Sequence, residues 1–277
     1  MDLNVNLIKY DWIALLATTL GLLGLVVAGW FVAGTPGVGI ILILGIGIVL
    51  FMLLENRREI FQNRQQNRQQ FEQTEALFGL YFSLSGILLP LPETKGWSAN
   101  ADLLRLIYKK IRREEPNLVV ELGSGSSTII GGYALQQNGS GCLVSLEHLE
   151  EHASQSRRMI SFYNLGDYSR VLEAPLIDYT LNGENWKWYS LENFDPEEPI
   201  DLVVVDGPPG SLQDLSRYPA FPLLKEWLSK ETTFIIDDGD REDERNMVGK
   251  WLREDSSATS EYRDVKGGAY ILDINDK

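Results

Sequence analysis

The sequence has 277 residues, 44% of them hydrophobic, and carries a formal net charge of −14. One cysteine, Cys142, excludes an intrachain disulfide, and so few cysteines and histidines argue against a zinc site or a Ser-His-Asp triad. Residues 90–277 hold 33 of the 39 acidic and 20 of the 25 basic side chains, so this part would repel phosphate and is a poor candidate for binding nucleic acid.

Two apolar runs open the chain, residues 12–33 and residues 37–54, with a Thr-Pro-Gly turn between them. As helices they would extend over about 33 Å and 27 Å, close to the thickness of a bilayer core. They predict a transmembrane hairpin over residues 1–54, with a buried core hairpin as the alternative. Basic residues after the second run predict that this flank, and with it the rest of the chain, faces the cytoplasm: Arg57, Arg58, Arg64 and Arg68.

Residues 55–91 are expected to connect this hairpin to a globular domain. Residues 55–75 are polar and free of glycine and proline, which favours a helical stalk over a disordered linker. Residues 76–92 are uncharged but interrupted by Gly79 and Gly86, which favours an interfacial or domain-docking helix over a third span.

Residues 92–277 alternate between strand-like and helix-like segments, the pattern of an α/β fold with a parallel sheet. A helix over 101–113 precedes the first strand. The last two segments lie close together around Lys266-Gly267-Gly268 and predict an antiparallel pair. Between residues 174 and 201 we expect an acidic loop rich in aromatic side chains. The strands are predicted at 118–122, 142–146, 170–174, 201–205, 233–236, 262–265 and 269–274, and the further helices at 126–137, 150–164, 218–229 and 243–253.

The segment Val119–Thr128, VVELGSGSST, predicts a nucleotide pocket. A strand runs into a glycine turn formed by Gly123, Ser124 and Gly125, and a helix that begins just beyond it offers free N–H groups. A glycine turn without any ligand is the alternative.

Two carboxylates indicate which nucleotide binds. Glu121, beside the turn, would repel a pyrophosphate and suits the ammonium group of an amino acid. Glu147 follows the next strand, where a carboxylate accepts hydrogen bonds from a ribose diol. An amino-acid end together with a ribose describes S-adenosylmethionine (SAM) better than NAD.

On these residues the chain resembles the class I SAM-dependent methyltransferases. Residues 121–125 are similar to their first motif and Glu147 to their ribose-binding acid, although Ser127 stands where many members have a third glycine. The resemblance implies a Rossmann-like seven-stranded methyltransferase sheet with helices on both faces, here preceded by two transmembrane helices. It also implies that Gly123, Ser124 and Gly125 bind the cofactor.

Further carboxylates follow the later strands: Asp206 after one, and Asp237 with Asp238 after the next. Strand ends meet at one edge of a parallel sheet, and carboxylate oxygens suit a hard cation. The pattern resembles the metal-dependent O-methyltransferases of the catechol and macrocin type. That resemblance implies Mg²⁺ on Asp206, Asp237 and Asp238, binding an acceptor hydroxyl. Alternatively, Asp206 only orients the methionine end of SAM, and Asp238 or Asp240 only caps a helix.

Further residues are expected to lie near the site. His148, next to Glu147, is expected to contact the cofactor on the adenosine side. Residues 206–210, Asp-Gly-Pro-Pro-Gly, are expected to line the acceptor pocket or to form a plain turn. Arg241 would bind a substrate anion or pair with Asp240 or Glu244. Pro92 and residues 97–99 would form a lid or pack on the first helix.

Together these features predict a membrane-anchored, cytoplasm-facing SAM-dependent methyltransferase with its catalytic domain over 92–277. The acceptor would be a hydroxyl of a membrane-proximal, glycan or small-molecule compound. The alternatives are an NAD(P)-linked Rossmann enzyme and a membrane scaffold that binds SAM without catalysis.

Overall fold

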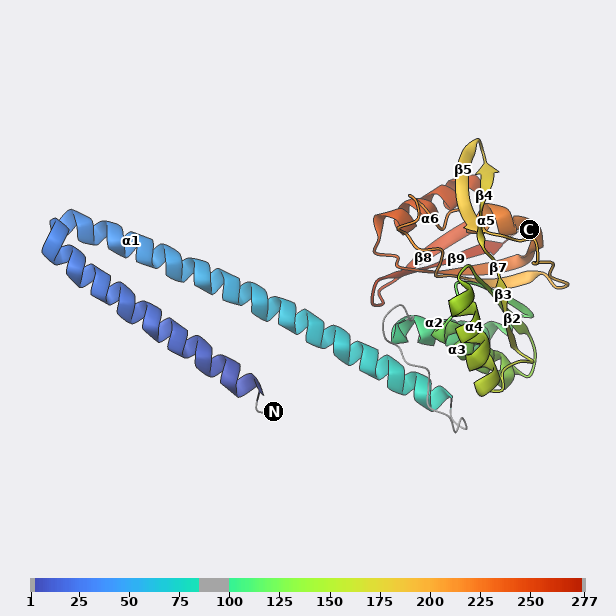
Figure 1. The fold of residues 1–277 in the computed structure, drawn as a ribbon, viewed down its shortest axis with the longest axis horizontal. Coiled ribbons are helices and arrows are strands. Elements are labelled where there is room, and N and C mark those ends of the chain that lie inside the picture. The colour runs from blue at the N-terminus through green and yellow to red at the C-terminus, as the bar shows by residue number, and fades with distance from the viewer. Residues whose placement is uncertain (1–2, 85–99, 276–277) are drawn as a thin grey trace. The chain divides into compact units, whose positions relative to one another are not determined.

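The computed structural model describes residues 3–84 and 100–275, and the chain divides into two compact units (Figure 1). The N-terminal unit covers residues 1–68 and the C-terminal unit residues 69–277. The long helix α1, Leu3–Ser83, belongs to both.

The N-terminal unit is helical, and its helix doubles back on itself in the blue part of the ribbon (Figure 1). The predicted reversal between two helical segments is therefore present. However, no helix in the described part of the chain is both long enough and apolar enough to cross a membrane. The prediction of two transmembrane helices at 12–33 and 37–54, and with it that of a two-pass membrane protein, is not supported.

The end of α1 belongs to the core of the C-terminal unit. Ala76, Leu80 and Leu84 are buried there, and Leu80 and Leu84 join an apolar cluster with side chains of α2, Ala101–Glu114. The first residue of α2 donates its backbone N–H to Gln73 Oε1 at 3.0 Å. Residues 55–83 lie within this helix, the prediction of a stalk followed by a docking helix stays a prediction, and residues 85–91 of that segment lie outside the described residues.

The C-terminal unit is built on a seven-stranded sheet in the order β3-β2-β1-β6-β7-β9-β8. The strands β3, β2, β1, β6 and β7 pair in parallel, whereas β9 is antiparallel to both β7 and β8, and its pairing with β8 is the predicted antiparallel pair. The strands are β1 Leu118–Leu122, β2 Cys142–Glu147, β3 Ser169–Glu173, β6 Ile200–Val205, β7 Leu228–Asp237, β8 Ala258–Arg263 and β9 Ala269–Asn275.

Successive side chains of a strand point to opposite faces, and here both faces are buried in apolar clusters. Val119 and Val204 contribute to the cluster that contains α2 and α3. Val120 and Val203 contribute to the other cluster, which contains α5 and α6. The predicted α/β fold with helices on both faces is confirmed. The helices are α3 Ser126–Asn138, α4 Glu150–Phe162, α5 Ala220–Leu224 with the 3-10 turn η1 Lys225–Trp227, and α6 Glu242–Glu254.

The prediction of a loop between the third and fourth sheet strands is wrong. This segment forms the antiparallel hairpin β4, Leu176–Leu181, and β5, Glu184–Tyr189. Its two turn residues, Asn182 and Gly183, both have positive φ, of 53° and 82°. Asn-Gly is a strong hairpin signal, but the charged residues around it obscured the alternating pattern of the strands.

The helix predicted over 218–229 is too long. Only α5 and the short turn η1 form, and β7 begins already at Leu228. Pro222 lies inside the short helix, where it cannot donate a backbone hydrogen bond.

The docking of α1 can be tested through Leu80, which is 1% exposed, with Leu77 on the same helix, 39% exposed, as the matched control. Leu80→Ala should lower the free energy of unfolding of the full chain by about 2–5 kcal/mol, because it leaves a cavity in a packed cluster. Leu77→Ala should cost about 0.5 kcal/mol. Urea denaturation measures both, and equal losses would contradict the docking.

Candidate functional site

The candidate site lies at the carboxyl ends of the parallel strands, where the strand order reverses between β1 and β6. In open α/β sheets ligands bind in the crevice at this position, because the connecting loops leave in opposite directions there. The predicted glycine turn follows β1, and the loop that begins at Asp206 follows β6. Both therefore border the crevice.

The glycine turn connects β1 to α3 in the way the sequence indicates. Gly123 has a φ of 95°, a conformation that favours glycine, and donates its N–H to Leu146 O at 2.9 Å. Gly125 directly precedes α3 and donates to Thr128 Oγ1 at 2.9 Å. The turn is therefore held at both ends by hydrogen bonds.

Glu121 is buried beneath this turn, with 1% of its surface exposed. Its Oε2 accepts hydrogen bonds from Thr128 Oγ1, at 2.6 Å, and from Ser145 Oγ. Its Oε1 is buried and has no hydrogen-bond partner among the described residues. Burial raises the pKa of Glu121 to about 7. Glu121 braces the turn, and its role as the partner of an ammonium group stays a prediction.

Glu147, at the end of β2, joins two loops. Its Oε2 accepts from Ser124 N at 3.0 Å and from Ser124 Oγ at 3.3 Å, while Oε1 accepts from Leu149 N at 3.0 Å. His148 Nδ1 lies 3.1 Å from Oε1. Burial alone would raise the pKa of Glu147, but interactions with His148 and the backbone N–H groups outweigh it, so its pKa is lowered. The predicted ribose partner is thus a buried carboxylate beside the turn.

The three predicted metal ligands are brought together by β6 and β7. One carboxylate oxygen from each of Asp206, Asp237 and Asp238 lies within 4.8 Å of the others. Burial, followed by the charge of Asp237, raises the pKa of Asp206 well above its usual range. Burial, followed by the charge of Asp238, raises the pKa of Asp237 to about 6. Burial is the larger cause of both shifts, and repulsion between the neighbouring carboxylates adds to it.

Arg217 is a site residue that the sequence analysis missed. It is 4% exposed and donates from Nη2 to Asp238 Oδ2 at 2.9 Å and from Nη1 to the backbone oxygen of Asp237 at 3.0 Å. It also lies 3.5 Å from Asp206 Oδ1 and from Glu244 Oε1. It stands in an irregular segment before α5, and an isolated arginine there gives no sequence signal.

Arg241 lies beside these carboxylates (Asp206, Asp237, Asp238 and Glu244, together the acidic rim) but is half-exposed. Its Nη1 is 2.8 Å from Asp238 Oδ2 and 3.8 Å from Glu244 Oε1. The expected local ion pair with Glu244 is present, with Asp238 as the nearer partner. Pro92 and residues 97–99, the expected lid, lie outside the described residues.

The cluster has the composition of a divalent-cation site, because carboxylates are the protein ligands that hard cations prefer. Asp238 is paired with two arginines, whereas no ion pair involves the side chain of Asp237 within residues 3–84 and 100–275. Its Oδ1 is buried without a hydrogen-bond partner in the same ranges. A further cation would therefore be accommodated at Asp237, and metal binding stays a prediction.

Comparison with known proteins assigns the class of the domain. Residues 120–239 match the family model described as a methyltransferase domain. No curated protein matches the chain. The match covers both the glycine turn and the acidic rim, and the predicted enzyme class, a methyltransferase, is confirmed.

A solved methyltransferase structure with a TM-score above 0.5 shares the fold, and two further ones are similar to part of the chain. A SAH-bound methyltransferase from Podospora anserina has a TM-score of 0.54 and 15% identity, over 77% of this chain and 96% of that one. An O-methyltransferase from Bacillus cereus in complex with SAH has a TM-score of 0.47 and 19% identity, over 73% and 90%. A methyltransferase from Geobacter sulfurreducens has a TM-score of 0.46 and 17% identity, over 63% and 78%.

The buried Glu121 predicts a pH-dependent stability in the absence of ligand. Its folded pKa, about 7, lies above the usual 4.5, so its stabilising contribution is complete below pH 4.5 and is lost as the pH rises through 7. The free energy of unfolding of wild type minus that of Glu121→Gln should fall by on the order of 2–3 kcal/mol from pH 5 to pH 8. Urea denaturation across this range measures it, and a difference independent of pH would contradict the assignment.

Proposed function

We propose that this methyltransferase transfers the methyl group of SAM to a hydroxyl oxygen of its acceptor. The observation that carries the proposal is the juxtaposition, across one crevice, of a glycine turn with Glu147 and a cluster of three carboxylates. The glycine turn with Glu147 suits a nucleoside that has an amino-acid end. The carboxylate cluster suits the activation of an acceptor hydroxyl. A methyltransferase-domain match over the same residues supports the combination.

The donor lies along the ends of β1 and β2. Glu147 is ionised and accepts hydrogen bonds from the ribose hydroxyls, in place of the one that Ser124 Oγ now donates. Gly123 and Gly125 let the chain approach the ligand because they carry no Cβ. Glu121 faces the cationic end of the donor, and the approach of a positive charge lowers its pKa and favours its carboxylate. His148 lies beside Glu147, on the adenosine side.

The transfer is an in-line displacement at the methyl carbon. A bond forms between the acceptor oxygen and this carbon, the carbon–sulfur bond breaks, and sulfur keeps the electron pair as a neutral thioether. The hydroxyl proton passes to a carboxylate of the rim. Asp237, with a pKa of about 6, is mostly ionised at neutral pH and more basic than an ordinary aspartate. Positioning of the two reactants contributes most of the rate.

Asp206, Asp237 and Asp238 are the residues that would hold a divalent metal such as Mg²⁺. When bound, such an ion polarises an acceptor oxygen and lowers the pKa of its hydroxyl. The support is the donor set itself and the unpartnered Asp237 Oδ1.

The acceptor is a neutral or cationic hydroxylated compound. The part of the chain that carries the site has a strong excess of acidic side chains, and among the described residues the rim combines four carboxylates with two arginines. Such a surface disfavours phosphate-rich acceptors, including nucleic acid.

Binding measurements separate SAM use from its main alternative, NAD(P)-linked chemistry. In isothermal titration calorimetry, SAM and SAH should bind the full chain with micromolar or tighter dissociation constants, and NAD should not bind measurably. Radiolabelled methyl transfer from SAM into hydroxylated extracts should then identify the acceptor. Tight NAD binding without SAM binding would overturn the proposal, whereas SAM binding without any transfer would favour a non-catalytic scaffold.

Asp237→Asn tests the role of the rim. We expect methyl transfer to fall by about 10²–10⁴-fold, because the variant lacks both the proton acceptor and the negative charge. SAM affinity, measured by calorimetry, should stay nearly unchanged, since the donor contacts lie at the ends of β1 and β2.

The matched control is Glu242→Gln, an exposed carboxylate on α6, which should keep wild-type activity. Activity assays with a chelator test separately whether a metal contributes. Full activity after chelation would exclude a metal role and leave the Asp237 prediction intact. Equal activity of Asp237→Asn and wild type would refute the proton-acceptor role.

A further inference from the structure

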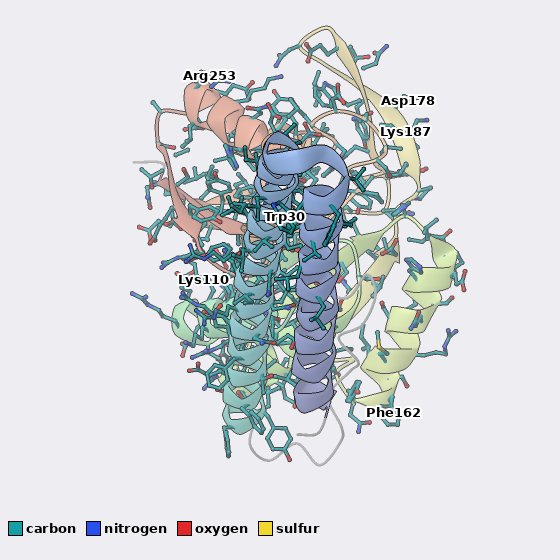
Figure 2. All side chains as sticks on the ribbon, turned by 90° about the vertical axis from the view of Figure 1, so that its left-hand side faces the viewer. Trp30, Lys110, Phe162, Asp178, Lys187 and Arg253 are labelled. Carbon is teal, nitrogen blue, oxygen red and sulfur yellow. The ribbon has the colours of Figure 1, made fainter. Side chains whose placement is uncertain are left out.

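The hairpin β4–β5 is packed against the domain through its aromatic side chains. Trp186, Trp188 and Tyr189 are all buried, and all three contribute to the cluster on the α5–α6 face of the sheet. On the outer side of the hairpin, Lys187 Nζ lies 3.4 Å from Asp178 Oδ1 across the two strands (Figure 2). The hairpin is therefore an anchored element whose last residue, Tyr189, is fixed in place.

Tyr189 reaches the crevice where the donor is proposed to bind. A Cβ placed on Gly207, at the end of β6, would lie 2.1 Å from the Tyr189 hydroxyl oxygen, and one placed on Gly123, at the end of β1, would lie 4.0 Å from it. The hydroxyl thus lies directly above the point where β1 and β6 diverge. The ring also meets that of His148 edge to face, with centroids 5.9 Å apart.

The backbone of Tyr189 is held in this position. Tyr179, on the neighbouring strand, donates its hydroxyl to Tyr189 O at 3.1 Å and accepts a hydrogen bond from Leu191 N at 3.2 Å. These bonds tie together β4, the end of β5 and the segment after it. The side chain is therefore presented to the crevice by a braced backbone, which reduces the entropy that a ligand contact would cost.

The Tyr189 hydroxyl group can donate a hydrogen bond to a ligand. No hydrogen bond joins it to any residue that the structure describes, although only 1% of the side chain is exposed. Burial and the neighbouring charge of Glu147 raise its pKa well above 10, so the group is neutral and donates. A donor without a partner inside the protein can gain one from a ligand that arrives beside it.

We propose that Tyr189 is a donor-contact residue, whose hydroxyl donates a hydrogen bond to an oxygen of SAM while its ring closes the crevice beside His148. This inference rests on the proposed function, because it assumes that SAM occupies the crevice. The β4–β5 hairpin, a separate two-stranded sheet, is then part of the cofactor site.

Tyr189→Phe tests the contact, because it removes the hydroxyl and keeps the ring. The dissociation constant of SAH, measured by calorimetry on the full chain, should rise about two- to tenfold, the value of one hydrogen bond. The matched control is Tyr133→Phe. Tyr133 is equally buried, on α3, and meets Tyr163 edge to face with centroids 5.8 Å apart, so this variant should bind SAH like wild type.

Tyr189→Ala removes the ring as well and should weaken binding further, and thermal melting checks that both variants fold. Wild-type affinity in Tyr189→Phe, or tighter binding in Tyr189→Ala, would overturn the inference, the latter because the ring would then obstruct the crevice. If wild-type protein itself fails to bind SAH, the proposed function fails first, so the two failures are distinguishable.

Discussion

The arrangement of the acidic rim depends on one buried cation, Arg217. Its guanidinium contacts the ends of β6 and β7 at once, through the backbone oxygens of Asp206 and Asp237 and the carboxylate of Asp238. Without a cation there, carboxylates within 4.8 Å of one another would repel, and burial would protonate them. A planar fork of five N–H donors satisfies several acceptors together, which a lysine could not do. The rim can therefore keep negative charge next to the place where a methyl group is transferred.

This rim is useful only because the sheet places it beside the glycine turn. The reversal of strand order between β1 and β6 is the position where open α/β sheets bind ligands, and apolar clusters pack on both faces of the strands around it. Donor and acceptor groups thus come from different strands but share one edge. The hairpin β4–β5 adds Tyr189 to the same crevice from outside the sheet. Most of the site is formed by loops at the ends of the sheet strands, and the hairpin adds one aromatic side chain to it.

Much of this was predictable, for local reasons. The bounds of β1 were predicted without error, because five successive apolar or buried residues run into a glycine that needs a positive φ. The carboxylates at strand ends were expected to meet, because parallel strands end at one edge, and three of them do. The transmembrane assignment of the N-terminal helix was not supported. The hairpin was missed because its Asn-Gly turn is surrounded by charged and aromatic residues that gave no clean alternation.

The sequence by itself determined the order of the seven sheet strands, the glycine turn and the chemical character of the rim, since these follow from local periodicity and residue type. Only the tertiary structure decided which charges are paired. Arg217 gives no local signal, yet burial beside Asp206 and Asp238 makes it the central cation. Likewise, Glu121 has its pKa raised, and Tyr189 reaches the crevice, only because distant segments enclose them. Desolvation and charge pairing act between residues far apart in the chain, so no pattern of neighbouring residues encodes them.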